Sequence, residues 1–292
     1  MRIFCLYLLC SLLLPLSVRA ETGPLEVFVS IAPQKFLVDR IGGPLIDSHL
    51  LVDKGQDPHS FEPTPRRLME LGGARLYFTV GLEFERMLTA RLGKNFAGLR
   101  FVAMDKGIEK LPMEEHEEAE GAPGDEEAQQ GEKDPHIWLS PLLFLKMAEN
   151  TTDALAQEDP SHAVQFFGRL NDLRQELLGI HQRLSAELLT YKGKAFYVFH
   201  PAFGYFAAAY GLIQRAVEAG GHSPGPRQLN TLIERARSEK VRIIFVQPQF
   251  DSKGAEAVAK AIDGVVIDLD PLAYDVPGNF MRIAEALRSS FH

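Results

Sequence analysis

The chain has 292 residues, a hydrophobic fraction of 46% and a formal net charge of −8 at pH 7. Much of that charge lies in one stretch, because residues 114–134 contain ten acidic residues and one lysine. The rest of the chain is nearly neutral, which excludes the broad basic surface that a nucleic-acid-binding protein needs.

Residues 1–20 have the pattern of a secretory signal peptide. Arg2 precedes an almost wholly apolar run at residues 3–16, and Val18-Arg19-Ala20 is a small-residue cleavage pattern. The apolar run is short for a membrane span, so an uncleaved anchor is the weaker alternative. We expect cleavage after Ala20 and a soluble protein in the periplasm. The net charge of the cleaved protein would be −10, because the chain of net charge −8 loses two arginines.

Both cysteines of the chain, Cys5 and Cys10, lie in this leader. Leu9 precedes Cys10 where a lipid-attachment motif needs a small residue, so no lipid anchor is expected there. The mature chain therefore has neither a disulfide nor a thiolate metal ligand, although it travels to an oxidising compartment. Its stability must come from burial, and its length allows two lobes with a large core.

Residues 21–160 are expected to form an N-terminal α/β lobe. Short β-branched and aromatic runs alternate with helical segments, which indicates a parallel sheet covered on both faces. The strands are predicted at residues 27–31, 48–52, 76–80 and 101–104, and helices at 34–41, at 65–72 and from about Ser140.

The segment 113–133 interrupts this alternation. It is rich in glutamate and contains Gly121, Pro123, Gly124 and Gly131, with no apolar periodicity. Such a segment buries too little apolar surface to offset the entropy of ordering it, so we expect a mobile acidic loop.

Residues 161–191 are predicted to form one long linking helix. Leucines, Phe166 and Ile180 recur at steps of three and four residues and make a continuous apolar stripe. A helix of this length spans roughly 45 Å, more than the width of one lobe. We interpret it as a rigid strut between two lobes; a coiled coil is the alternative.

Residues 192–292 resume the alternation and are expected to form a C-terminal α/β lobe. The strands are predicted at residues 195–199, 212–217, 241–246 and 265–269, and the helices at 227–239, 254–262 and 278–290. The predicted fold is therefore two α/β lobes, each with a four-stranded parallel sheet flanked by helices, joined by one long helix.

Four polar residues fall where such a fold places its ligands. His200 directly follows the strand at 195–199, and Asp270 follows the strand at 265–269. His59 lies in the loop after the second strand, and His136 opens the segment that leads to the helix near Ser140. Ligands of open parallel sheets gather at the carboxyl ends of the strands, so we expect the four to meet in the cleft between the lobes.

Three imidazoles and one carboxylate make a closed site for a divalent transition metal, zinc above all. Each residue also has an ordinary interpretation: a loop histidine is often only hydrogen-bonded, and Asp270 suits a helix N-cap. The remaining histidines within the mature chain, on the predicted linking helix, inside a strand or at the terminus, are given that ordinary interpretation. The joint placement of His59, His136, His200 and Asp270 is what favours these four residues as metal ligands.

The segments around these residues resemble the motifs of the zinc/manganese solute-binding proteins of bacterial ABC importers (metal-binding cluster A-I). The similar segments are Asp57-Pro58-His59-Ser60-Phe61-Glu62-Pro63-Thr64-Pro65, Asp134-Pro135-His136-Ile137-Trp138-Leu139-Ser140-Pro141, Phe199-His200-Pro201-Ala202-Phe203-Gly204-Tyr205-Phe206 and Leu269-Asp270-Pro271-Leu272. They run in order over nearly the whole mature chain. The resemblance implies metal ligands at His59, His136, His200 and Asp270.

The chain departs from this family in two places. Zinc-type members often carry a histidine-rich loop before the second ligand, whereas this loop is rich in glutamate and holds only His116. Many members also have a Glu-Pro-Ser-Pro segment where this chain reads Gly221-His222-Ser223-Pro224-Gly225-Pro226. Ser223 stands at the place of that glutamate, and His222 is a candidate to compensate for it.

The resemblance implies a monomeric periplasmic protein that captures the metal between its lobes and delivers it to a membrane permease. Three neutral imidazoles favour Zn²⁺, whereas Mn²⁺ prefers oxygen ligands, so manganese is the alternative cargo. A zinc hydrolase is a weaker alternative, because no His-Glu-x-x-His motif is present and Asp270 would fill the open position. No glycine-rich turn for a dinucleotide follows the first strand. A surface adhesin would have the same fold.

Overall fold

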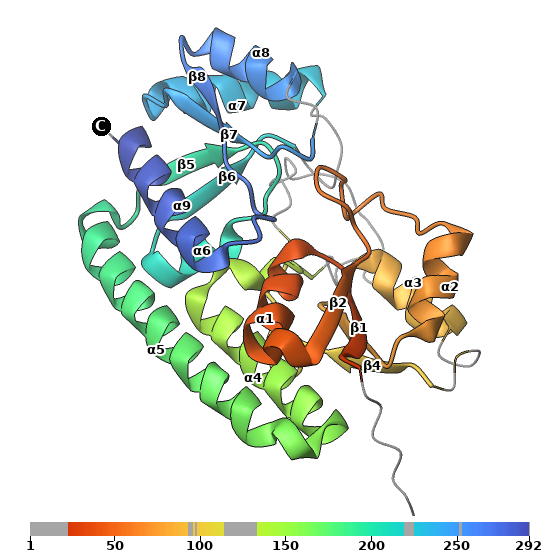
Figure 1. The fold of residues 1–292 in the computed structure, drawn as a ribbon. Helices are drawn as coiled ribbons and strands as arrows, with labels where there is room; N and C mark the ends of the chain where they lie inside the picture. Colours follow the sequence, from red (N-terminus) through yellow and green to blue (C-terminus); the bar gives the residue numbers. More distant parts are fainter. Residues whose placement is uncertain are drawn as a thin grey trace, which may run out of the picture.

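The computed structural model describes residues 23–92, 96, 98–113, 133–218, 225–250 and 253–291 (Figure 1). The predicted signal peptide, at residues 1–20, and residues 114–132 of the acidic loop lie outside this part of the chain. Within it, no helix is long and apolar enough to cross a membrane. The chain forms two four-stranded parallel sheets with helices around them, which confirms the predicted fold class.

The N-terminal sheet has the strand order β2-β1-β3-β4, and every neighbouring pair is parallel. Its strands are β1 (Leu25–Val29), β2 (Ile46–Leu50), β3 (Leu76–Thr79) and β4 (Arg100–Ala103). The helices that follow the first three strands, directly or after a loop, are α1 (Ala32–Gly42), α2 (Pro65–Gly73) and α3 (Glu83–Leu92). The sequence did not predict α3.

The C-terminal sheet repeats this plan with the order β6-β5-β7-β8. Its strands are β5 (Ala195–Val198), β6 (Ile213–Ala216), β7 (Ile243–Val246) and β8 (Val265–Asp268). The helices are α6 (Gly204–Tyr210), α7 (Pro226–Ser238), α8 (Lys253–Ala261) and α9 (Val276–Ser290). The sequence did not predict α6. In each sheet the second strand in the sequence pairs on one side of the first strand, and the third strand pairs on its other side. Both sheets therefore have a topological switch point beside their first strand.

The long helix α5 (Ala163–Leu188) runs along one side of both lobes (Figure 1). One 3₁₀ turn precedes it at Pro160–His162 and another follows at Leu189–Tyr191, so the predicted range 161–191 is helical throughout. Its fully buried side chains are Phe166, Leu170, Leu173, Leu177, Leu184 and Leu188. With 26 residues it is about 39 Å long.

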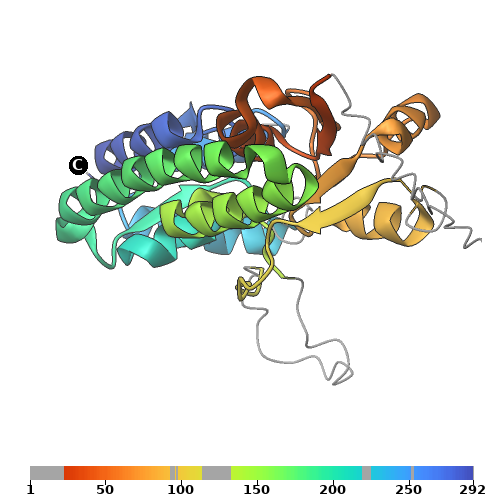
Figure 2. The ribbon, with the colours of Figure 1, turned by 60° about the horizontal axis from the view of Figure 1, so that its bottom comes forward.

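The helix α5 is packed over most of its length and is not a free-standing strut. Helix α4 (Pro141–Glu158) lies beside it (Figure 2), and α1 and α9 also contact it. Some buried residues of the C-terminal sheet, including Tyr197 and Ile244, form a core of their own. Buried residues of α4, α5 and the N-terminal sheet, however, form one continuous apolar core with Phe196, Val198 and Phe245 of the C-terminal sheet. A shared core of this kind resists relative motion of the two lobes.

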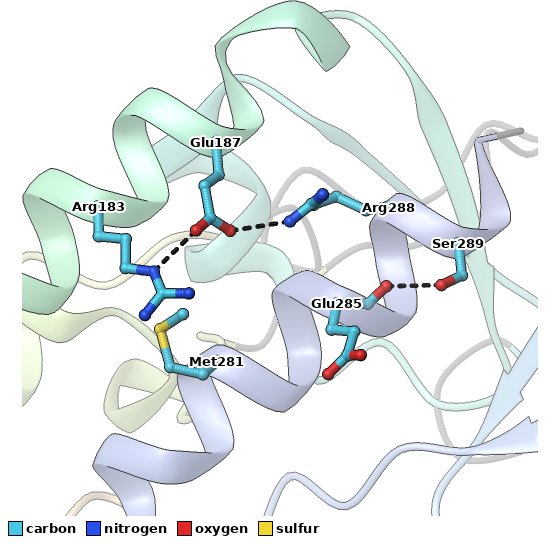
Figure 3. A pocket seen from close by; sticks show the side chains of 6 residues that line it. All are labelled: Arg183, Glu187, Met281, Glu285, Arg288 and Ser289. Carbon is cyan, nitrogen blue, oxygen red and sulfur yellow. Dashed lines mark hydrogen bonds and ion pairs between the residues drawn. The ribbon is translucent and has the colours of Figure 1, made fainter.

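Ion pairs on the surface also hold α5 against α9, as Figure 3 shows. Glu187 accepts from Arg183 Nε at 2.7 Å on its own helix and from Arg288 of α9 at 3.1 Å. The hydrogen bond from Arg183 and the charges of both arginines lower the pKa of Glu187. Because Glu187 is partly exposed and both arginines are substantially exposed, we expect these pairs to contribute little to stability.

The turn between β3 and α3 is built on a buried carboxyl group. Glu85 Oε2 accepts hydrogen bonds from the backbone N–H groups of Val80, Gly81 and Leu82 at 2.6–2.9 Å. Its other oxygen accepts the hydroxyl of Ser30, which is bonded in turn to the Tyr77 hydroxyl at 2.7 Å. Burial raises the pKa of Glu85 to about 7, although these hydrogen bonds oppose the shift.

Candidate metal centre

Each of the three predicted site histidines has a proline neighbour and lies in a loop between elements. His59 lies in the loop after β2, next to Pro58, where Asp57 Oδ1 accepts its backbone N–H at 2.9 Å. His136 follows Pro135 and immediately precedes a 3₁₀ turn at Ile137–Leu139. His200 follows β5 after one residue and precedes Pro201. Pro201 restricts the backbone of His200 before it, whereas Pro58 and Pro135 have fixed backbone angles and direct the chain into His59 and His136.

The three imidazoles meet between the lobes. One ring nitrogen from each of His59, His136 and His200 lies within 4.8 Å of the others. The Nε2 atoms of His136 and His200 are 3.3 Å apart. The cavity beside them has a volume of only about 10 Å³, which suits one ion or water molecule rather than an organic ligand.

Two buried carboxylates orient two of these rings. His136 Nδ1 is 2.7 Å from Asp134 Oδ1, which also accepts the His136 backbone N–H at 2.8 Å. His200 Nδ1 is 2.5 Å from Glu218 Oε1. When each Nδ1–H donates to its carboxylate, each Nε2 presents a lone pair to the other ring. Two lone pairs 3.3 Å apart repel each other, and a cation between them removes that repulsion.

Burial keeps the histidines in the state that a metal requires. It lowers the pKa of His136 well below the usual range, and the nearby His59 lowers it further. Burial also lowers the pKa of His200, against the opposing effect of the hydrogen bond to Glu218. Metal ligation needs the neutral imidazole, so protons compete little with a metal near neutral pH. Burial raises the pKa of Asp134 to about 7.

Asp270 is not one of the converging groups in this structure. Its Oδ1 accepts hydrogen bonds from Gln249 Nε2 and from the backbone N–H of Leu272, each at 2.9 Å. Its side chain lines a neighbouring cavity of about 410 Å³ between the lobes. The bond to Leu272 is a local turn contact, and the helix α9 begins only at Val276, so Asp270 does not cap a helix. Asp270 therefore lies beside the histidine cluster with its carboxylate held elsewhere.

Sequence reasoning missed several residues around the histidines. Gln247 holds the His200 backbone with two bonds, accepting its N–H at 3.0 Å and donating to its carbonyl at 2.9 Å. Phe250 stacks on the His200 ring at a centroid distance of 4.6 Å. Glu218 directly follows Val217 at the carboxyl end of β6, where the strand-end rule could have found it. His222 and Ser223 lie outside the described residues.

One other group of side chains in the described part of the chain has metal-ligand spacing. Glu26, Asp47 and His49 share one face of β1 and β2, with His49 Nε2 at 2.6 Å from Glu26 Oε2 and 3.8 Å from Asp47 Oδ1. All three are substantially exposed, and an ordinary ion pair accounts for the contacts. The buried histidine cluster is the better metal centre.

Comparisons with known proteins identify relatives that bind transition metals. The profile of the family described as zinc-uptake complex component A, periplasmic, matches residues 27–287. A high-affinity zinc uptake system protein ZnuA from Yersinia pestis is 28% identical over 84% of this chain and 82% of its own length. A manganese ABC transporter substrate-binding lipoprotein PsaA from Streptococcus anginosus is 26% identical over 77% of this chain and 72% of its own length.

Solved structures support the same relationship. A crystal structure of ZnuA superimposes with a TM-score of 0.83 and 32% identity, covering 92% of this chain and all of that one. A zinc-bound ZnuA deletion mutant gives 0.82 and 33% identity over 92% of this chain and 98% of its own length. The family comprises substrate-binding transport proteins and not enzymes, so the hydrolase alternative is wrong. The chain belongs to the family of the periplasmic zinc-uptake component A, the metal-binding proteins of ABC importers.

Proposed function

We propose that the protein captures Zn²⁺ between its lobes and delivers it to the membrane permease of an ABC importer. The observation that carries this proposal is the set of three imidazoles around a cavity of about 10 Å³. His136 and His200 are 3% and 5% exposed, so a bound ion would be largely removed from water. Neutral imidazoles suit zinc better than manganese, and the Irving–Williams order favours zinc further.

The proposed ligands are His59, His136 and His200, with the fourth position open to Asp270 or to a water molecule. The three histidines need only small side-chain adjustments to share one ion, because their nitrogens already lie within 4.8 Å of one another. Asp270 would first have to leave its bonds to Gln249 and Leu272. We place the protein in the periplasm as a monomer, after removal of residues 1–20. A manganese-preferring member of the family is the second candidate, because PsaA is among the relatives.

Metal-dependent thermal stability tests the proposal. An ion that binds the folded site and not the unfolded chain stabilises the fold by about 4 kcal/mol at a thousand times its Kd. Zinc should therefore raise the Tm of metal-free protein, and His200→Ala should remove most of that rise while leaving the apo Tm nearly unchanged. His162→Ala is a matched control, since His162 is a partly exposed histidine paired with Asp159 at the surface. An equal zinc shift in His200→Ala would refute the site.

Competition distinguishes the two metals. Metal-free protein offered equal zinc and manganese should retain zinc, measured by elemental analysis after gel filtration. Retention of manganese in excess would favour the second candidate. Import of the metal in cells that lack the chain tests the delivery step separately from binding, and it also distinguishes transport from a purely adhesive role.

A further inference from the structure

Gln249 stands between the three-histidine cavity and Asp270. It lies just after β7 and lines both the cavity of about 10 Å³ beside the histidines and the cavity of about 410 Å³ beside Asp270. We propose that Gln249 is a positioning residue that keeps the carboxylate of Asp270 outside the ligand set and so sets the preference for zinc over manganese. This inference rests on the proposed function of the site.

The bonds around Asp270 hold its loop in place from several sides. Gln249 Nε2 and the Leu272 N–H both donate to the same carboxylate oxygen. Asn279 Nδ2 donates to the Asp270 carbonyl at 2.8 Å, and Trp138 Nε1 donates to the Pro271 carbonyl at 2.8 Å. The backbone of the loop is therefore fixed, and only the side chain of Asp270 is free to turn. Gln249 and the Leu272 N–H restrain that turn, and Gln249 is the side chain among these two donors.

The amide of Gln249 has a defined orientation. Its Nε2 must face the carboxylate, since a carboxylate only accepts hydrogen bonds. Its Oε1 is buried and receives no hydrogen bond from any described residue. An unsatisfied buried acceptor destabilises the fold, and the charge-assisted bond to Asp270 opposes that effect. This oxygen belongs to a side chain on the wall of the histidine cavity.

The unsatisfied Oε1 of Gln249 suits a metal ion that is bound by the three histidines and one water molecule. A metal held by three imidazoles needs a fourth ligand, and a water in that position would find an acceptor in Gln249 Oε1. Asp270 would then stay in its present bonds. A set of three imidazoles and water offers no anionic oxygen, and so disfavours manganese relative to a set that includes a carboxylate.

Removing the amide donor tests this arrangement. Gln249→Met keeps a side chain of similar length but cannot bond to Asp270, so the carboxylate keeps only its bond to the Leu272 N–H and turns toward the metal more easily. We expect the ratio of zinc affinity to manganese affinity to fall at least about tenfold, or about 1.4 kcal/mol. The double variant Gln249→Met/Asp270→Asn should restore the ratio, because the freed group is then no longer a carboxylate.

The absorption spectrum of bound Co²⁺ gives a second measurement. Its response would not be altered if Gln249 only maintained the fold. Asp270→Asn alone should leave the Co²⁺ spectrum of the otherwise wild-type protein unchanged, whereas in the Gln249→Met background it should shift the spectrum. A spectral change of equal size in both backgrounds would show that Asp270 is already a ligand and would overturn the inference. An unchanged zinc-to-manganese ratio in Gln249→Met would overturn it as well. Failure of the wild-type protein to bind either metal would instead refute the proposed function.

Discussion

Two carboxylates decide how two of the imidazoles face the metal cavity. Asp134 and Glu218 each bond to an Nδ1 atom, which leaves Nε2 of His136 and of His200 pointing at each other. Both acids are almost fully buried. A buried acid bonded to a buried imidazole makes that imidazole a stronger donor to a metal, because it stabilises positive charge on the ring.

Replacing Glu218 by glutamine tests this effect on affinity. The glutamine oxygen would still accept the Nδ1–H of His200, but the negative charge is lost. We expect zinc affinity to fall about 10- to 100-fold, measured by competition with a chelator of known affinity. Glu234→Gln, at an exposed position on α7, is the control and should leave affinity unchanged. Equal affinities in the two variants would show that Glu218 only maintains the fold.

The sequence predicted that three histidines would converge, as they do in the structure, but it did not predict their surroundings. Each histidine follows from local signals, namely flanking proline and a position after a strand. Asp270 was also placed correctly at a strand end, but the direction of its carboxylate depends on Gln249, which lies 21 positions away in the chain. Glu218 reaches His200 because β5 and β6 are neighbours in the sheet. Contacts of this kind depend on strand order, which residue patterns alone did not determine.

At the scale of elements, apolar periodicity predicted correctly those helices and strands that are long or strictly alternating. The stripe of α5 and the β-branched runs of the eight strands were recognised within a few residues. Helix α6 was missed because it has seven residues and is largely buried, so no polar face marks its period. Helix α3 begins at a turn that depends on Glu85, a buried acid that hydrophobic patterning cannot anticipate.

Glu85 should make stability depend on pH. Its pKa is raised to about 7 in the folded protein and is near 4.5 without burial. The folded state therefore favours the protonated acid, and this contribution is fully present below about pH 4.5 and is lost as pH rises through 7. The side chain of the Glu85→Gln variant cannot ionise. Between pH 4.5 and pH 7.5, its free energy of unfolding should therefore rise by about 3 kcal/mol relative to that of the wild type.

Urea unfolding of both proteins over this pH range measures the difference. Other titrating groups, including Asp134 with its pKa near 7, are common to the two proteins and cancel in the comparison. A free-energy difference that stays constant with pH would show that Glu85 keeps its charge, stabilised by its three backbone donors and Ser30.

At the scale of the whole molecule, the acidic loop and the metal centre are separable on chemical grounds. Carboxylates without imidazoles are weakly selective for zinc, and residues 114–132 contain one histidine. Deleting these residues should leave the tight zinc affinity unchanged and remove only additional weak sites in titration calorimetry. A tenfold loss at the tight site, about 1.4 kcal/mol, would show that the loop belongs to it.

The shared core implies that metal capture moves the lobes very little. Helix α5 contacts α1 of one lobe and α6 and α9 of the other, and Trp138 bonds across the lobes to Pro271. A packed interface permits small sliding or rocking displacements, of about 2 Å, rather than a wide hinge opening. Both cysteines lie within residues 1–20, so a protein that begins at Glu21 allows labels at two introduced thiols without background.

Spin labels on opposite lobes measure this motion directly. Arg66→Cys on α2 and Lys260→Cys on α8 are exposed positions that lie far from the described core. The mean distance between the labels should change by no more than about 2 Å when zinc is added to metal-free protein, while its distribution narrows because the ion links His59 and His136 to His200. Adding His200→Ala should abolish the narrowing. A change of about 10 Å on zinc binding would contradict the shared core and would require α5 to bend or detach from one lobe.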